Sequence, residues 1–362
     1  MTSIRLTSHF IPAFAVLLLL WIPGAAPSAA TEHDQASVAH PDWFKSSFLD
    51  LRVDLEEARA AGKAGLLLFF HTPSCSYCKA LLRTTFADAS VARRLRAEFD
   101  VVALDVLGDV EVTDLDGRSH WASQFAVHEK AHFTPTLVFY GTEGKRLLRL
   151  VGYQPPERFH AVLDYLEQGR YASQSLRDFL AERKSAPPAE RRSAEPRDPL
   201  FARPPCILDR RLAPSDRPLF VLFERGDCPS CERLHGFLRE PELRSLLSRY
   251  EAVRLDMNDS ETRLVTPAGD RYNAREWADA LGLLHAPALL FFDESGKEVL
   301  RTDSELFVDA SGAAIEDSTE KFVGNLAARF RYVLAKDYRT YPQFQQWRLR
   351  QAAGSDRQSH PR

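Results

Sequence analysis

The sequence predicts an α/β protein made of two tandem domains, each with a central mixed sheet flanked by helices. Two CxxC pairs, Cys75/Cys78 and Cys228/Cys231, lie about one domain length apart. Each pair follows a short, continuous apolar run, which is typical of a buried strand, and precedes apolar residues at helical spacing. With 362 residues, the chain is long enough for two cores of ordinary size.

The composition excludes several classes of protein. Apolar residues make up 44% of the chain and charged residues 27%, with 23 Phe, so neither a disordered nor a low-complexity protein fits. Lys and Arg number 47 against 50 Asp and Glu, which gives a net charge of −3. This balance excludes a dedicated nucleic-acid binder and a polybasic membrane ligand, so we expect no nucleic-acid partner.

The first 30 residues have the features of a secretory signal peptide. Arg5 precedes an apolar run at 10–22, and small residues lead to Ala30, where we expect cleavage. The apolar run is shorter than the roughly 20 residues that a membrane span needs, although an uncleaved anchor is the alternative. The mature protein is therefore predicted to be exported, either periplasmic or secreted.

The first copy predicts a series of alternating strands and helices. In chain order we expect a strand at 65–71, a helix opened by the first CxxC, a strand at 101–106, a turn at 116–117, a helix around Trp121, strands on both sides of a turn at 143–145, and a helix at 159–169. The first of the two late strands, at 135–140, begins directly after Thr134 with Pro135. The predicted first domain is 31–183.

The second copy follows the same order. We expect strands at 218–224, 252–257 and 287–292, a helix opened by the second CxxC, a helix around Trp277, a turn at 295–297, an extra loop at about 303–319, and a helix at 322–336. A stretch rich in Pro, Arg, Glu and Ala at 184–205 is typical of a solvated linker. The predicted second domain is 206–350, followed by a flexible tail at 351–362.

Both copies resemble thioredoxin-fold domains. The first, with CSYC, TPTLVFY and PPERFHAVLDYL, is similar to the periplasmic SoxW-type thioredoxins over about 42–183. The second matches more loosely over about 206–350, through CPSC, the Ala-Pro strand start and a Gly-Lys turn. The resemblance implies a thiol–disulfide oxidoreductase with redox-active CxxC centres.

Thiol–disulfide exchange needs an attacking thiolate. A cysteine at the start of a helix is favoured as the anion by the unpaired N–H groups and the helix dipole, so Cys75 and Cys228 are the candidate nucleophiles. Cys78 and Cys231 lie within the first turn and are the candidate resolving thiols. We expect no cofactor beyond these redox-active disulfides.

Other uses of a CxxC pair need other neighbours. Covalent haem attachment requires His after the second cysteine, but Lys79 and Glu232 stand there, so haem is excluded. A four-cysteine zinc site would need the two pairs to come together, and pairs in separate domains are poorly placed for that. We therefore predict no metal site. Binding of a soft ion such as copper by one pair remains an alternative.

The resemblance assigns substrate binding to the two X-Pro pairs, Thr134/Pro135 and Ala286/Pro287. It implies a cis proline beside each CxxC and a preceding residue whose exposed backbone pairs with an extended client. The alternative is a trans proline that starts a strand.

The chain also departs from thioredoxin, which has a buried Asp six residues before the first cysteine. Phe69 and Leu222 occupy that place here. The nearest ionisable residues are His71 and Glu224, each four residues before the first cysteine of its pair. Both are candidates for changing the pKa of that cysteine. For His71, the alternative is a surface histidine with no effect on the thiol. Because His71 is neutral or positive and Glu224 is negative, we expect Cys75 to be more acidic than Cys228.

The fifth cysteine, Cys206, has no partner by count and is either an inert buried thiol or a link between two chains. For the whole protein we predict reduction of disulfides in exported proteins. The resemblance implies a membrane thiol transporter as electron donor and a sulfur-oxidation protein as acceptor. The alternative is a non-catalytic module that binds a client or a soft metal.

Overall fold

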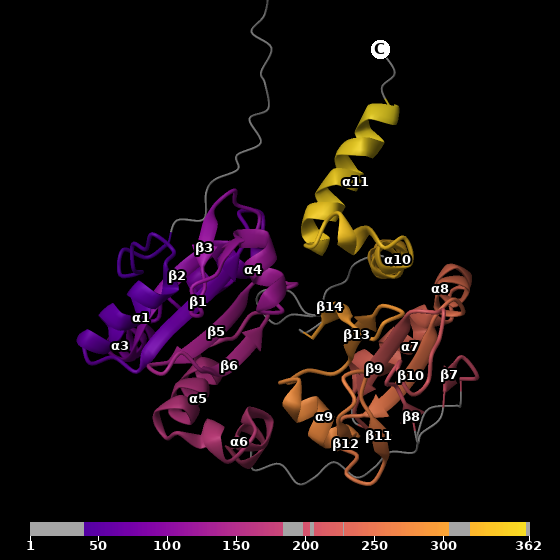
Figure 1. Ribbon diagram of the computed structural model, residues 1–362, viewed down its shortest axis with the longest axis horizontal. Helices are drawn as coiled ribbons and strands as arrows, with labels where there is room; N and C mark the ends of the chain where they lie inside the picture. The colour runs from indigo at the N-terminus through magenta and orange to yellow at the C-terminus, as the bar shows by residue number, and fades with distance from the viewer. Residues whose placement is uncertain (1–39, 184–197, 203–205, 227, 304–318, 360–362) are drawn as a thin grey trace, which may run out of the picture. The chain divides into compact units, whose positions relative to one another are not determined.

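The computed structural model describes residues 40–183, 198–202, 206–226, 228–303 and 319–359 (Figure 1). The predicted signal peptide, the start of the predicted first domain at 31–39 and most of the predicted loop at 303–319 lie outside these residues. No helix in the described ranges is both long enough and apolar enough to cross a membrane.

The first domain is built on a mixed four-stranded sheet with the order β2-β1-β5-β6. Strand β1 pairs in parallel with β2 and antiparallel with β5, which pairs antiparallel with β6. The elements are α1 (Leu51–Ala60), β1 (Gly65–His71), α2 (Ser76–Arg83), α3 (Ala89–Glu98), β2 (Phe99–Asp105), β3 (Glu111–Thr113), β4 (Ser119–Trp121), α4 (Ala122–His128), β5 (Thr136–Gly141), β6 (Arg146–Val151), α5 (Pro156–Glu167), η1 (Arg170–Ala172) and α6 (Leu176–Arg183).

The second domain repeats this plan with an added edge strand, in the order β14-β13-β9-β10-β7. Its elements are β7 (Phe201–Ala202), β8 (Cys206–Ile207), β9 (Leu219–Glu224), α7 (Pro229–Leu238), α8 (Pro241–Leu247), β10 (Glu251–Asp256), β11 (Arg263–Val265), β12 (Arg271–Asn273), α9 (Ala274–Ala280), β13 (Ala288–Phe292), β14 (Glu298–Thr302), α10 (Thr319–Leu334), η2 (Asp337–Arg339) and α11 (Phe344–Ser359). The predicted α/β class is confirmed.

The central strand of each sheet is buried on both faces. In β1, Leu67 and Phe69 pack with α2, α3 and α5, whereas Leu66, Leu68 and Phe70 pack with α1 and α4. Strand β9 divides its residues between two apolar clusters in the same way. Two-sided burial explains why both strands are continuous apolar runs rather than alternating ones. It also holds the end of each strand, and the CxxC that follows, in a defined place.

The apolar residues that follow each CxxC lie in two consecutive helices rather than in one. In the first domain, α2 ends at Arg83 and α3 starts at Ala89, because the Asp88 side chain accepts hydrogen bonds from the Ser90 and Val91 backbone N–H groups and caps a new helix. In the second domain, Pro241 begins α8 directly after α7.

Two predicted boundaries differ from the structure. Strand β7 lies inside the predicted linker at 184–205 and pairs in parallel with β10, so the second sheet begins before residue 206. Helix α11 continues to Ser359, through most of the predicted flexible tail at 351–362. Phe344 and Trp347 anchor this helix in the apolar core of the second domain.

Cys206 lies in the short strand β8, which pairs with β11. It is free, 7% exposed and packed in the apolar cluster that contains Leu264 and Trp277. Burial raises the pKa of the Cys206 thiol to about 11, and the charge of Glu251 acts in the same direction. The structure therefore supports the inert thiol rather than a link between two chains.

We predict that Cys206 resists alkylation in the folded, oxidised protein. At pH 8 a thiol with a pKa of about 11 is ionised in only about one molecule in a thousand, and the sulfur is also shielded. Mass spectrometry after iodoacetamide treatment should show modification at least about 100-fold slower than in urea. Fast labelling of the native protein, or a dimer that Cys206→Ser abolishes, would contradict this assignment.

Candidate active site

Each CxxC pair opens a helix at the carboxyl end of its central strand. Cys75 is the N-cap of α2, and its sulfur accepts a hydrogen bond of 3.0 Å from the Cys78 backbone N–H. Cys228 is the N-cap of α7, and its sulfur accepts one of 3.1 Å from the Cys231 backbone N–H. These donors and the helix dipole favour negative charge on the first sulfur of each pair.

Both pairs form disulfides in the structure, with Cα atoms 5.2 Å apart in each. They differ in exposure. Cys75 is partly exposed and Cys78 is fully buried. A partner can therefore contact the sulfur of Cys75 but not that of Cys78. In the second domain both sulfurs are shielded, with Cys228 4% and Cys231 5% exposed. The second disulfide is therefore the less accessible of the two.

The two X-Pro loops lie at the same end of the sheets as the disulfides. Both the Thr134–Pro135 and the Ala286–Pro287 bonds are cis, as the resemblance implied. Residue Thr136, next to Pro135, pairs with Phe70 at the end of β1. In the second domain, Cys228 Sγ lies 3.5 Å from the carbonyl oxygen of Ala286.

The residues before the two cis prolines are less exposed than backbone pairing with a client would require. Thr134 is only 9% exposed, and Ala286 is half-buried, whereas the expected role needs exposed backbone. Pairing of Thr134 or Ala286 with a client therefore remains a prediction.

His71 closes β1 and is buried, which rules out the surface position. Its Nε2 lies 3.1 Å from Nε2 of His40, and its ring stacks on Phe69. Burial, reinforced by the neighbouring His40, lowers the pKa of His71 to about 4. The imidazole is thus neutral near pH 7, so the structure favours the neutral form of the two that the sequence allowed for His71.

Asp105 completes this cluster, because it pairs with His71 in the parallel β1–β2 register. Burial raises the pKa of Asp105, while the Leu107 backbone N–H and His40 act against that change. The sequence analysis identified neither Asp105 nor His40, which precedes every predicted strand and helix, as part of the site. No local pattern marks His40, since only the fold brings it to the end of β1.

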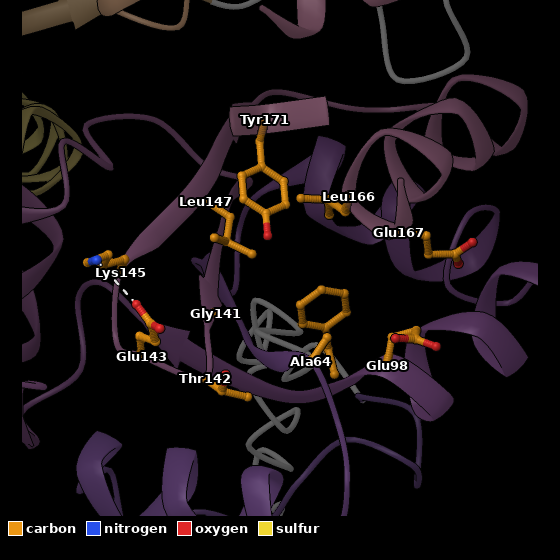
Figure 2. A pocket seen from close by; sticks show the side chains of 11 residues that line it. Ala64, Glu98, Gly141, Thr142, Glu143, Lys145, Leu147, Leu166, Glu167 and Tyr171 are labelled. Carbon is orange, nitrogen blue, oxygen red and sulfur yellow. Dashed lines mark hydrogen bonds and ion pairs between the residues drawn. The ribbon is translucent and has the colours of Figure 1, made fainter. Parts of the chain in front are cut away.

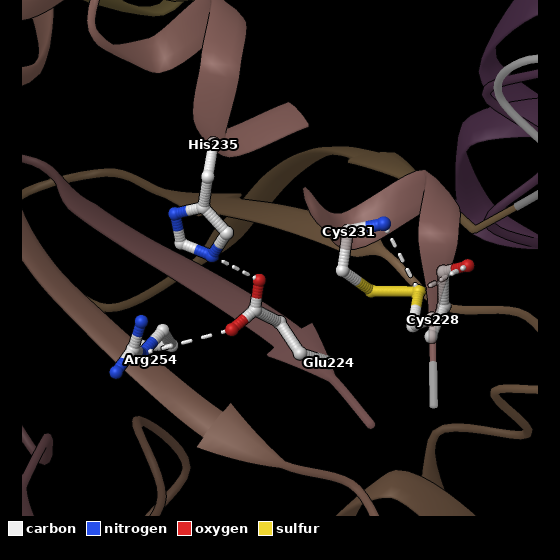
Figure 3. Close-up of a disulfide and its surroundings, with 6 residues drawn as sticks. Glu224, Cys228, Cys231, His235 and Arg254 are labelled. Carbon is white, nitrogen blue, oxygen red and sulfur yellow. Dashed lines mark hydrogen bonds and ion pairs between the residues drawn. A yellow bond between two sulfur atoms is a disulfide. The ribbon is translucent and has the colours of Figure 1, made fainter. Parts of the chain in front are cut away.

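Glu224, the residue of β9 equivalent to His71, carries a different set of partners (Figure 3). His235 Nε2 lies 2.5 Å from Glu224 Oε1, and Arg254 Nε lies 3.6 Å from Glu224 Oε2. The three side chains come from β9, α7 and β10 and are mostly buried. The negative charge of Glu224 is therefore offset by these two partners.

A cavity of about 340 Å³ lies elsewhere in the first domain (Figure 2). Its walls include Ala64 and Gly141, at the start of β1 and the end of β5, with Phe99, Leu147 and Tyr171. This is the opposite end of β1 from His71, so the cavity is separate from the disulfide. Among the described residues, no group of three or more His, Cys, Asp or Glu is arranged to hold a metal ion.

Comparison with known proteins agrees with this geometry. The model of the thioredoxin-like domain matches residues 51–167 and 210–310, more than half of the chain. The protein belongs to the thioredoxin-like family. Its two CxxC pairs are accordingly placed for thiol–disulfide redox chemistry. The narrower resemblance to SoxW-type thioredoxins remains a prediction, and no curated protein shows significant similarity to this chain.

Solved structures that are similar to parts of this chain are thioredoxin-fold and related proteins. A thioredoxin-fold protein from Helicobacter pylori is 18% identical, with 40% of this chain and 89% of that chain covered and a TM-score of 0.27. A disulphide isomerase from Xylella fastidiosa is 18% identical, with 41% and 100% covered and a TM-score of 0.24. The first two thioredoxin domains of Saccharomyces cerevisiae Eps1p are 13% identical, with 75% and 95% covered and a TM-score of 0.23.

We predict that His71 makes the first domain less stable in acid. Its pKa is about 4 in the folded domain, against about 6.5 in an unfolded chain. Between those values the unfolded chain takes up a proton that the folded domain does not, so stability falls as the pH drops from about 6.5 to 4. His71→Gln does not titrate and should lose up to about 3 kcal/mol less over this range.

Urea unfolding at pH 7 and pH 4.5, followed by tryptophan fluorescence, measures this difference. His160→Gln, on α5 of the same domain, is the matched control and should follow the wild-type pH dependence. Parallel curves for the wild type and His71→Gln would show that His71 is not the group responsible.

Proposed function

We propose that this protein reduces disulfide bonds in exported proteins through the Cys75/Cys78 dithiol. The observation that carries the proposal is the arrangement of the first pair. Cys75 is partly exposed at a helix N-terminus, Cys78 is buried directly behind it, and the Pro135 loop lies at the same end of the sheet. A partner can thus meet only one of the two sulfurs, which is what ordered exchange requires.

The reaction follows from this order of access. In the reduced protein, the Cys75 thiolate attacks one sulfur of the client disulfide, forms a mixed disulfide and releases the other client sulfur as a thiolate, which takes up a proton. Cys78 then loses its proton and attacks the sulfur of Cys75, releasing the second client thiol. Two electrons pass to the client, and the protein is left with the Cys75–Cys78 disulfide seen in the structure.

Continued reduction needs an electron donor and a suitable compartment. The apolar run at 10–22 and the small residues before Ala30 support export to the periplasm or beyond the cell. Thiols are not kept reduced there by a soluble buffer. We therefore propose a membrane thiol transporter as the donor, which would return two electrons to the Cys75–Cys78 disulfide.

One observation favours a second role for part of the chain. Both sulfurs of the Cys228–Cys231 pair are buried, so a large client meets neither of them directly. On this basis we propose that the second domain is a client-binding module whose thiols turn over slowly.

Reduction of insulin with dithiothreitol as electron source should separate these roles. We predict that Cys75→Ser lowers the rate of insulin precipitation at least about tenfold, because the exposed nucleophile is lost. Cys228→Ser should keep more than about half of the wild-type rate, since its sulfur is shielded from a protein substrate. Equal loss in both variants would contradict the division of roles, and an inactive wild type would favour a pure binding module.

We also predict that Cys78→Ser traps clients. Without the resolving thiol, the mixed disulfide between Cys75 and its client persists. Non-reducing gels of the variant from its native compartment should show adducts that dithiothreitol removes, and mass spectrometry would identify the client. The double variant Cys75→Ser/Cys78→Ser is the control and should form none. Absence of adducts from Cys78→Ser would count against the exchange mechanism.

A further inference from the structure

The residue that precedes cis-Pro135 is covered by the second domain. The two domains belong to one compact unit. Gln345, on α11 of the second domain, places its Nε2 3.4 Å from Oγ1 of Thr134. The neighbouring Phe133 packs against the apolar core of the second domain, and the guanidinium carbon of Arg329 on α10 lies 5.2 Å from the centre of its ring. These contacts explain why Thr134 is only 9% exposed, although it precedes the proline of the predicted client edge.

Gln343 contacts the approach to the same proline. It lies directly before α11 and is fully buried. Its Nε2 lies 3.4 Å from two carbonyl oxygens of the first domain, those of Ser123 on α4 and of Ala131. A side-chain amide that donates to backbone carbonyls makes the kind of contact that a peptide N–H of a bound chain would make. The second domain therefore presents peptide-like donors to the loop that leads to Pro135.

A buried group of charges joins the edge strands of the two sheets. Arg149 on β6 and Arg301 on β14 occupy equivalent places in the registers of their sheets. Both guanidinium groups lie against Oδ2 of Asp303, at 2.8 and 3.2 Å, and all three side chains are almost completely buried. Lys130 forms a further ion pair of 3.1 Å with Glu298. Because loss of one partner leaves an uncompensated buried charge, these pairs hold the loop of the first domain against the second domain.

The contact is reciprocal, since the helix that closes each domain meets the equivalent helix of the other domain. Gln343, next to α11, meets Ser123 on α4. On the other side, α6 of the first domain meets α9 of the second through two ion pairs, Arg177 with Asp279 at 2.8 Å and Asp178 with Arg275 at 2.6 Å. Helices α4 and α9 are equivalent, because each follows the small hairpin of its domain and precedes the cis proline. The duplicated domains thus pair through matching surfaces, as the subunits of a symmetric dimer do.

We propose that Gln343 and Gln345 occupy the client edge of the first domain, and that an extended client displaces them before its backbone can pair with Thr134. This inference rests on the exchange chemistry of the proposed function. It separates two classes of disulfide. A small disulfide reaches the partly exposed sulfur of Cys75 without moving the second domain, whereas a protein client needs the edge. The second domain thereby limits reduction to chains that can compete for the edge.

The closed contact is one that a client can replace. The three donor contacts of Gln343 and Gln345, at 3.4 Å, are at the long end of the hydrogen-bond range and are correspondingly weak. Three buried atoms at this contact also have no hydrogen-bond partner among the described residues, namely Gln343 Oε1, His132 Nδ1 and Asp303 Oδ1. Opening exposes these atoms to water and satisfies them, which offsets part of the free energy lost with the closed contact.

The test uses the full chain with Cys228→Ser/Cys231→Ser, so that only the first site exchanges. Gln343→Ala/Gln345→Ala removes the amides that occupy the edge. It should raise the rate of insulin reduction at least about threefold, because a larger fraction of the molecules is open to the client. The rate with the small disulfide 4,4′-dithiodipyridine should stay within about twofold of the parent, since this probe does not need the edge. Gln346→Ala, one position further along α11, is the matched control and should change neither rate.

A second variant and a second readout do not depend on these amides or on activity. Asp303→Asn keeps the size of the side chain but loses the charge that pairs with Arg149, so it should also raise insulin reduction. Hydrogen–deuterium exchange, measured by mass spectrometry on peptides that contain residues 130–134, reports whether the edge is covered. Exchange there should be faster in both opening variants than in the parent and in Gln346→Ala.

Two results would overturn the inference. They are unchanged exchange at 130–134 in both folded opening variants, or faster exchange there without any rise in insulin reduction. Circular dichroism verifies folding, and Gln345→Ala alone, at a partly exposed position, supplies the test if the double variant does not fold. Failure of the proposed function looks different: neither the parent nor any variant would reduce insulin, while exchange at 130–134 would still respond to the opening variants.

Discussion

The structure depends on the two-sided burial of one strand in each domain. Strands β1 and β9 are covered by apolar clusters on both faces, so they cannot shift in register without exposing a core. The carboxyl end of each strand is fixed as a result, and with it the N-terminus of the helix that carries the CxxC. A helix N-terminus favours a thiolate at the first cysteine of a reduced pair, so the placement of both sites for exchange follows from how the core packs.

The same scaffold surrounds its two disulfides with different groups. At the first site, His71, His40 and Asp105 form a cluster in which burial keeps the imidazole of His71 neutral, and the first sulfur is partly exposed. At the second site, a carboxylate pairs with an imidazole and a guanidinium, and both sulfurs are shielded. The first sulfur of the first site is therefore accessible from solvent, while the second disulfide is enclosed, and Glu224 near it is paired with His235 and Arg254. Duplication has yielded two sites of unequal access rather than two copies of one activity.

Most of the fold was predictable because its signals are local and repeated. The CxxC spacing, the apolar strands and the X-Pro strand starts recur in the same order, and the structure has the strands and helices in those places. The differences are also local. Asp88 ends one apolar helical pattern and starts another, and β7 has only two residues, too few to show any periodicity. The sequence of helix α11 has no continuous apolar face, and for this reason the residues after 350 were predicted to be a flexible tail.

The sequence by itself determined the fold class, the duplication and the placement of Cys75 and Cys228 at helix starts, because each depends on residues that are close in the chain. The sequence could also have placed His235 on the same helix face as Cys231, because the two residues are four positions apart. Only the tertiary structure decided that His40 meets His71, that Glu224 meets Arg254, and that Cys228 is shielded while Cys75 is partly exposed. Those contacts join separate elements, and their geometry is set by strand register and helix packing, which no local pattern encodes.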